Sequence, residues 1–189
     1  MTKSGGTWTV LITPFTADGS TVDTSALRRL VNWQIENGVQ GLIPLGSTGE
    51  FLSVSRAERQ EIVETCVKTA AGRVPVYVGT GAEKTSEVIE LSREADGMGA
   101  DGVMIIPPFY CTPTDDELFT HFRRVGEAIS IPIMLYNNPA TANIDIRPEL
   151  VAKVSEIDAV ASIKESTFDV TRVRDIVELA GDRIDVFAG

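Results

Sequence analysis

One lysine stands where it could act as a nucleophile. Lys164 directly follows an apolar run, residues 160–163, whereas the remaining lysines lie in the N-terminal tail or in polar, helix-like stretches: Lys3, Lys68, Lys84 and Lys153. At the end of a buried strand an amine is partly removed from water, which favours its neutral, nucleophilic form. Such an amine attacks a ketone to form an imine, which then serves as an electron sink. A structural ion pair with a carboxylate such as Glu165 is the alternative, and both roles stay open.

Two of the three tyrosines also follow apolar runs. Tyr136 ends residues 131–136, and Tyr110 lies in the segment PPFYCTP after residues 102–106. A phenol can transfer protons when hydrogen bonds orient it, although an aromatic side chain that lines a core edge is the commoner case. Both tyrosines are therefore candidate acid–base groups.

A glycine-rich turn, GSTGE, follows a further apolar run at residues 46–50. Backbone N–H groups and the hydroxyls of Ser47 and Thr48 would suit a carboxylate or a phosphate, although an ordinary turn can have the same sequence. The segment lacks the lysine of a phosphate-binding P-loop, and GTGAEK from Gly79 does not fit the pattern G-x-G-x-x-G. The sequence therefore disfavours nucleotide binding.

Histidine chemistry is restricted, because His121 is the only histidine. Zinc sites built from two or three histidines are excluded, and with them most metal-dependent aldolase and hydrolase designs. His121 lies in a helical pattern at residues 115–130, where a surface or core histidine is more typical than a member of a Ser-His-Asp triad.

The elements that must position these groups alternate along the chain. Apolar runs predict seven strands, at residues 7–12, 41–45, 75–79, 102–106, 131–136, 160–163 and 184–188. Amphipathic stretches between them predict six helices, at residues 25–38, 55–72, 85–99, 115–130, 147–157 and 169–181. The strands are apolar almost throughout, which is typical of a parallel sheet covered on both faces. Active sites of such folds lie at the carboxyl ends of the strands, where the candidate residues stand.

Composition narrows the class of protein. The 189 residues are 43% hydrophobic and carry a net charge of −10, which disfavours binding to nucleic acids or anionic membranes. No apolar run approaches the about 20 residues of a membrane span, and the N-terminus has no apolar segment of a secretory signal. Two cysteines, Cys66 and Cys111, are too few for a disulfide scaffold. We expect a single cytoplasmic domain over residues 1–189, either a doubly wound sheet or a (β/α)8 barrel.

Five motifs together resemble one known family. They are TPF at residues 13–15, GSTGE at 46–50, PFY at 108–110, YNNP at 136–139 and IKE at 163–165. In order and spacing they are similar to those of the dihydrodipicolinate synthase and N-acetylneuraminate lyase family of pyruvate-dependent lyases. The resemblance implies an α/β fold, the (β/α)8 TIM barrel, followed by a helical C-terminal region. Because a complete barrel has eight strands, the chain is expected to be a partial barrel, truncated after its seventh strand.

The resemblance also implies roles for individual residues. Lys164 would form a Schiff base with pyruvate or another 2-keto acid, and Tyr136 would be the general acid and base beside it. Ser47 would link Tyr136 to Tyr110 in a proton relay, with Tyr110 supplied by a neighbouring subunit of a homotetramer. Backbone amides of Ser47 and Thr48 would hold the substrate carboxylate. This chemistry needs no metal and no organic cofactor.

One position departs from the family pattern. Dihydrodipicolinate synthases normally have an arginine after Y-N-x-P that binds the carboxylate of the second substrate, and here Thr141 occupies that position. Thr141 is therefore a candidate contact to the distal part of a neutral or hydroxylated substrate, in a pocket that Pro139 and Asn143 could also shape. We expect an aldolase or dehydratase that acts on a 2-keto acid. The alternatives are a non-catalytic sensor that binds keto acids and a phosphate-binding protein that uses GSTGE as its anion cradle.

Overall fold

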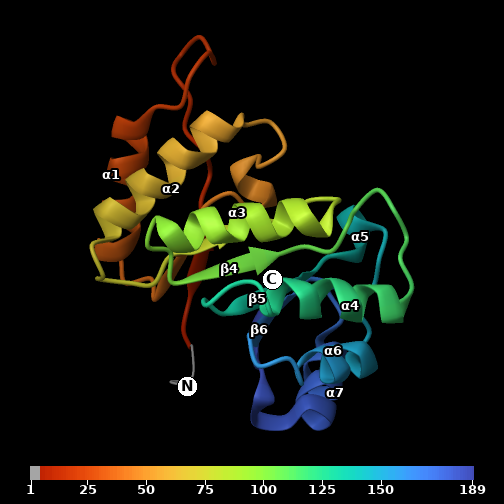
Figure 1. Cartoon of the computed structure of the whole chain (residues 1–189). Helices are drawn as coiled ribbons and strands as arrows, with labels where there is room; N and C mark the ends of the chain where they lie inside the picture. The colour runs from red at the N-terminus through yellow and green to blue at the C-terminus, as the bar shows by residue number, and fades with distance from the viewer. Residues whose placement is uncertain (1–4) are drawn as a thin grey trace. The chain divides into compact units, whose positions relative to one another are not determined.

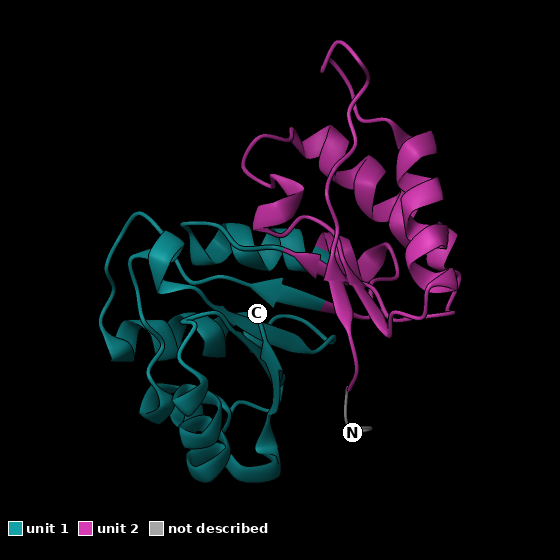
Figure 2. Cartoon of the chain, turned by 180° about the vertical axis from the view of Figure 1, so that it is seen from behind, with its two compact units in different colours: residues 1–4, 80–93, 103–189 teal, residues 5–79, 94–102 magenta. Residues whose placement is uncertain are grey.

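The computed structural model describes residues 5–189, which form two compact units (Figure 2). Unit 2 contains residues 5–79 and 94–102, and unit 1 contains residues 80–93 and 103–189.

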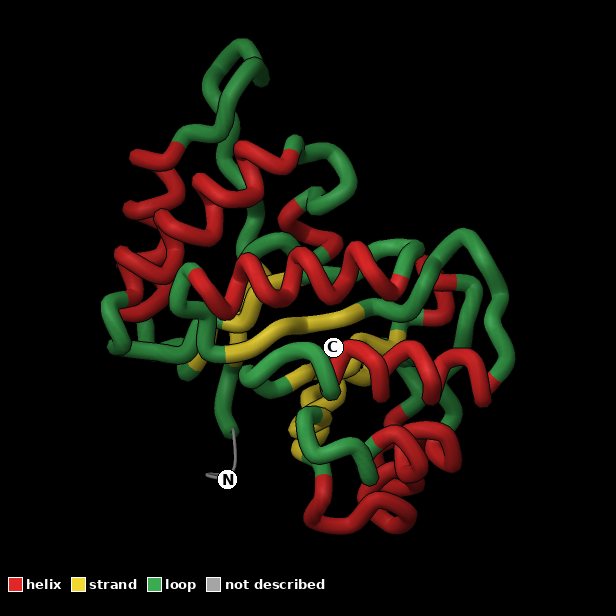
Figure 3. Tube along the Cα trace, in the orientation of Figure 1, coloured by secondary structure: helices red, strands yellow, loops and turns green. Residues whose placement is uncertain are grey.

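Strands and helices alternate along the chain (Figures 1 and 3). The strands are β1 Trp8–Val10, β2 Gly41–Ile43, β3 Tyr77–Gly79, β4 Gly102–Ile105, β5 Ile133–Asn137, β6 Val160–Glu165 and β7 Asp185–Ala188. The α-helices are α1 Thr24–Glu36, α2 Arg56–Ala70, α3 Thr85–Gly97, α4 Asp115–Gly126, α5 Pro139–Ala142, α6 Pro148–Val154 and α7 Val170–Ala180. Two 3-10 helices are η1 Ser47–Gly49 and η2 Gly181–Arg183. Each predicted strand and each predicted helix is confirmed, and the short helix α5 is an addition.

Unit 2 is built on the parallel pair β1–β2, in which Trp8 is opposite Gly41. A parallel bridge between Leu42 and Val76 extends this pairing to the residue before β3. Helices α1 and α2 pack against each other. Ser55 and Glu58 form the reciprocal capping box at the start of α2, because the side chain of each accepts from the backbone N–H of the other.

Unit 1 contains a parallel sheet with the strand order β4-β5-β6-β7. Every residue of β4 and β5 is buried, which explains why these strands are apolar and do not alternate. Helix α6 packs between α4 and α7. The carboxyl ends of β5 and β6 hold Tyr136 and Lys164, so the fold places the two predicted groups on neighbouring strands.

Helix α5 was not predicted, and its cause is local. Pro139 stands at its first position, where the missing N–H costs nothing and the fixed φ angle favours a helical turn. The turn ends at Asn143, which adopts a left-handed conformation with φ of 58°. The Y-N-x-P motif therefore ends β5 and immediately begins a helical turn that contains Thr141.

Candidate active site

Lys164 and Tyr136 form the centre of the candidate site. They are register partners in the parallel pair β5–β6, so their side chains leave the sheet on the same face. The Nζ atom of Lys164 lies 4.3 Å from the centroid of the Tyr136 ring. This geometry places the amine over the face of an aromatic ring. No ion pair joins Lys164 to Glu165 within residues 5–189, so that alternative role for the lysine is not observed.

The Tyr136 hydroxyl is buried and oriented. The residue is 5% exposed, and its hydroxyl oxygen accepts a hydrogen bond of 2.8 Å from Nδ2 of Asn138. Because the amide can only donate to this oxygen, the phenolic proton stays available for another acceptor. The phenol is therefore held in one orientation with its proton free to be transferred.

Thr141 is coupled to the same asparagine. Its backbone N–H and its hydroxyl both donate to the carbonyl of Asn138, at 3.1 and 3.3 Å. The Thr141 side chain is exposed in α5. Asn138 thus bonds both to Thr141, the predicted substrate contact, and to Tyr136, the predicted acid–base group.

Two residues beside Lys164 were not predicted as members of the site. A Cβ atom at position 189 would lie 2.7 Å from Cε of Lys164 and 2.1 Å from Oγ of Ser166, so only glycine fits there without a shift. The Ser166 hydroxyl is buried and has no hydrogen-bond partner within the described chain. The only sequence signal for a role of Ser166 in the site was its position two residues after Lys164.

The GSTGE turn forms η1 in unit 2. The Ser47 and Thr48 side chains are exposed, and their backbone N–H groups make no hydrogen bond to the described part of the chain. These are the free donors that the first residues of a helical turn leave unpaired. The hydroxyl of Thr13 donates to the carbonyl of Gly49 at 2.7 Å, which ties the TPF motif to the turn.

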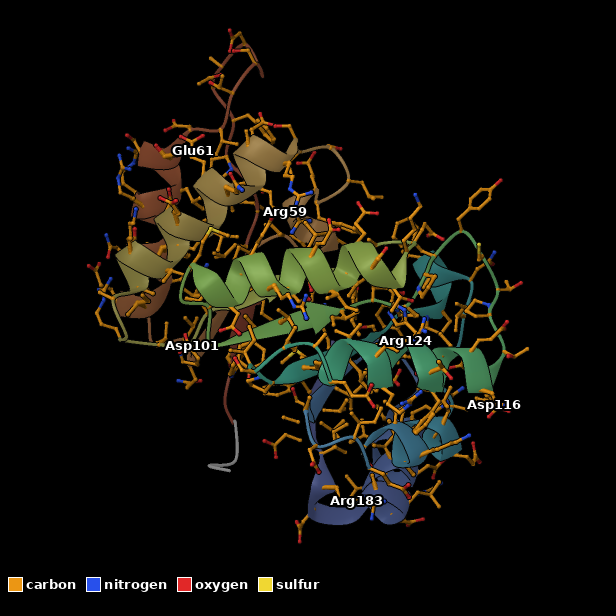
Figure 4. The ribbon with its side chains drawn as sticks, viewed as in Figure 1. Arg59, Glu61, Asp101, Asp116, Arg124 and Arg183 are labelled. Carbon is orange, nitrogen blue, oxygen red and sulfur yellow. The ribbon has the colours of Figure 1, made fainter. Side chains whose placement is uncertain are left out.

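A close approach between strands fixes the start of this turn. A Cβ atom at Gly79 would lie 2.0 Å from the carbonyl oxygen of Leu45, so β3 reaches the turn only because residue 79 is glycine. The guanidinium of Arg59, which leaves α2 (Figure 4), donates to the Gly79 carbonyl at 2.7 Å. Leu45 itself has a left-handed backbone, with φ of 61°.

Tyr110 lies in the loop after β4. Its side chain is 86% exposed. The backbone N–H groups of Phe109 and Tyr110 both donate to Oε1 of Glu83 at 2.8 Å. Glu83 therefore fixes the backbone of the loop and leaves the phenol in solvent.

The remaining candidates behave as structural groups. His121 is a core histidine of α4, and burial lowers its pKa to about 4. Its Nδ1 atom lies 2.9 Å from the Thr85 hydroxyl. Burial likewise raises the pKa of the Cys66 thiol to about 12. Residues 5–189 hold no group of three or more His, Cys, Asp or Glu side chains placed to bind a metal, and no described helix is long and apolar enough to cross a membrane.

The structure thus brings Lys164 and Tyr136 together and connects Thr141 to Tyr136 within unit 1. Tyr110 lies in the same unit on its own loop. Ser47 and Thr48 belong to unit 2, and their part in a common site stays a prediction.

Parallel strands that are each followed by a helix define an α/β protein, and solved structures with TM-scores of 0.92 to 0.96 assign it to the (β/α)8 barrels, as predicted. The chain belongs to the dihydrodipicolinate synthetase family, whose profile matches residues 3–189.

Named relatives agree with this assignment. The chain is 42% identical over 184 residues to 4-hydroxy-tetrahydrodipicolinate synthase of Pelobacter propionicus, covering 97% of this chain and 63% of the relative. A dihydrodipicolinate synthase of Acinetobacter baumannii complexed with pyruvate superposes with a TM-score of 0.96 at 32% identity, over 99% of this chain and 64% of that one. YagE of E. coli K12, a prophage protein of the same family in complex with pyruvate, gives 0.93 at 34% identity, over 97% and 63%. The chain therefore spans a little under two thirds of the length of these relatives.

Proposed function

We propose that the protein is a Schiff-base-forming lyase that acts on pyruvate or a related 2-keto acid. The observation that carries the proposal is the position of the Lys164 amine over the Tyr136 ring. The two residues lie near the carboxyl ends of two neighbouring parallel strands. Two of the solved relatives are named as complexes with pyruvate, which supports this choice of substrate.

The chemistry begins with the amine. In its neutral form the Lys164 nitrogen attacks the keto carbon, and the carbinolamine that results loses its hydroxyl group as water to give a protonated imine. Tyr136 donates the proton that the departing hydroxyl needs and can take a proton back in a later step. Loss of a proton from the neighbouring carbon then gives an enamine. The enamine attacks an aldehyde, forms again in the reverse cleavage, or expels a β-substituent in a dehydration.

The exposed amides of η1 suit the substrate carboxylate. Ser47 and Thr48 would bind it through backbone N–H groups, since these donors have no partner in the described chain. The Ser47 hydroxyl would relay protons between Tyr136 and Tyr110. We assign Tyr110 to the site of a neighbouring subunit in a homotetramer, a role for which its 86% exposure leaves the side chain free.

Thr141 supports a second substrate without a carboxylate at its far end. The Thr141 side chain is exposed on α5. Its hydroxyl donates to the carbonyl of Asn138, whose side-chain amide donates to the Tyr136 hydroxyl. A threonine offers one neutral hydroxyl, whereas an arginine would offer a charged, two-pronged donor. We therefore infer that the physiological partner of pyruvate is a neutral or hydroxylated aldehyde, or that the reaction is a dehydration of a hydroxylated acid.

Trapping the imine tests the proposal. The chain is incubated with pyruvate, reduced with borohydride and digested, and the lysine peptides are compared by mass spectrometry. We expect an adduct on Lys164, with the other lysines as internal controls, and none with lactate, which has no keto group. Lys164→Arg should abolish the adduct. A chain that is folded by circular dichroism and binds pyruvate without an adduct would be a keto-acid sensor instead.

A further inference from the structure

The last residue pair of β5 and β6 carries a polar contact on the opposite side of the sheet from the lysine. Asn137 and Glu165 are register partners, one position after Tyr136 and Lys164. Since successive side chains of a strand point to opposite faces, Asn137 and Glu165 lie behind the catalytic pair. Nδ2 of Asn137 donates to Oε2 of Glu165 at 2.9 Å.

Asn137 is fully buried, and each of its polar atoms has a partner. Nδ2 also donates to Oδ1 of Asp145 at 3.2 Å, and Oδ1 accepts from the backbone N–H of Ile146 at 2.9 Å. The second oxygen of Glu165, which is itself 5% exposed, accepts from the N–H of Thr167 at 2.8 Å. One amide therefore ties together the end of β5, the end of β6 and the segment before α6.

Arg172 supplies the positive charge. Its guanidinium donates to both carboxylate oxygens of Asp145, with Nη1 at 2.9 Å from Oδ1 and Nη2 on Oδ2. Burial alone would raise the pKa of Asp145, but hydrogen bonds from Arg172 and Asn137 outweigh it and hold this pKa below its ordinary value. The bond to Asp145 in turn raises the pKa of Arg172, with a further contribution from the charge of Glu165. We call these four residues, Asn137, Asp145, Glu165 and Arg172, the Asn137 network.

We propose that the Asn137 network sets the spacing between Lys164 and Tyr136, which makes Asn137 and Glu165 positioning residues for imine formation. This inference rests on the proposed function. The ladder between β5 and β6 is irregular at Ile133 and Met134, so the regular pairing that holds the two strand ends in register is short. The Asn137–Glu165 contact adds a side-chain tie at the final pair. Misplacing a reacting group by about 1 Å can cost about 100-fold in rate, so such a tie matters for the chemistry.

Three variants separate positioning from stability. Asn137→Ala removes the central amide, and Glu165→Gln keeps the shape of its side chain but removes the charge. Val151→Ala, in the buried face of α6, removes core volume and none of the hydrogen bonds of the network. The rate of borohydride trapping on Lys164 is measured against pyruvate concentration, with circular dichroism on the same samples.

We expect Asn137→Ala to lower the maximal trapping rate by about 10- to 100-fold, while the pyruvate concentration for half-maximal rate changes less than about 3-fold. Glu165→Gln should give a smaller fall, and the double variant should fall by less than the two single effects combined, because both disrupt the Asn137–Glu165 contact. Val151→Ala should trap at the parent rate.

The outcomes are distinct. If the parent chain itself gives no adduct on Lys164, the proposed function fails and the positioning role fails with it. If the parent is trapped and folded Asn137→Ala is trapped equally fast, or if Val151→Ala falls as far, only the positioning role is overturned. If Asn137→Ala does not fold, Glu165→Gln decides the matter: a rate equal to the parent overturns the proposal, and a lowered rate with unchanged half-maximal concentration supports it.

Discussion

The side-chain amide of Asn138 donates a 2.8 Å hydrogen bond to the hydroxyl of Tyr136, only two residues earlier in the chain. Tyr136 is the last but one residue of β5, and Asn138 stands between the end of that strand and the first residue of α5. A turn that leaves a strand and at once enters a helix brings this amide back to the phenolic oxygen. The sequence Y-N-x-P therefore orients the Tyr136 phenol locally, beside Lys164 of the next strand.

Removing the phenolic oxygen should separate its role from that of the ring. Tyr136→Phe keeps the ring under Lys164 but removes the proton donor, so we expect imine trapping to slow by about 100-fold or more. Unfolding in urea should show a loss of only about 1 kcal/mol, since one hydrogen bond is lost. Asn138→Ala keeps the Tyr136 hydroxyl but removes the hydrogen bond that orients it, so this variant should slow trapping less. Equal rates for Tyr136→Phe and the parent would remove Tyr136 from the mechanism.

Gly189 should be required for activity more than for stability. An added Cβ would meet Cε of Lys164 and Oγ of Ser166, both of which can move aside. We expect Gly189→Ala to displace the lysine and slow trapping about 10-fold, with little change in melting temperature. Gly97→Ala is the matched control, because nothing lies within 4 Å of its Cβ position at the end of α3. A parent-like trapping rate for Gly189→Ala would show that the lysine does not need this space.

Glu83 should control the order of the Tyr110 loop. Its Oε1 atom accepts both the Phe109 and the Tyr110 N–H groups, so Glu83→Ala leaves two amides without a partner. We expect hydrogen exchange at these two amides to speed up by at least about tenfold, while β4 keeps its protection. Glu83→Gln retains an acceptor oxygen and should restore most of the protection. Unchanged exchange in Glu83→Ala would mean that the loop is held by other contacts.

Stability should fall in mild acid because of His121. Burial lowers its pKa from 6.5 to about 4 in the folded state, so the unfolded chain binds the proton more readily. The stability that this difference provides is fully present above pH 6.5 and is lost as the pH falls towards about 4. The shift corresponds to at most about 3 kcal/mol.

Urea unfolding at pH 7, 5.5 and 4 measures this loss. His121→Asn does not titrate in this range, so its unfolding free energy should decline less between pH 7 and 4 than that of the parent. The asparagine amide lies at the position of the imidazole Nδ1 atom and can keep the hydrogen bond to Thr85, which makes the variant a fair comparison. Parallel declines in the two proteins would assign the acid sensitivity to carboxylates.

The order of strands and helices could be predicted from the sequence because buried parallel strands are apolar on both faces. The pairing of Lys164 with Tyr136 also follows from the sequence, since both end successive strands of such a sheet. The Asn137–Glu165 contact could not be predicted, because each residue faces away from the predicted site and Asp145, to which Asn137 also donates, comes from an irregular segment. The steric role of Gly189 depends on how closely the end of β7 approaches Lys164, which no sequence pattern encodes.

Thr141 should determine which aldehyde reacts with the enamine. Thr141→Arg would place a two-pronged cation on α5, and such a group is suited to a carboxylate. We expect the variant to favour a four-carbon aldehyde with a terminal carboxylate over the same aldehyde without it, by about tenfold relative to the parent chain. Thr141→Met introduces a long side chain without the charge of the arginine, and so controls for size. Pyruvate-dependent consumption of the two aldehydes gives the ratio. Imine trapping on Lys164 should be unaffected, because the hydrogen bonds of Thr141 go to the carbonyl of Asn138 and not to Lys164 or Tyr136. An unchanged aldehyde ratio in Thr141→Arg would place the second substrate elsewhere.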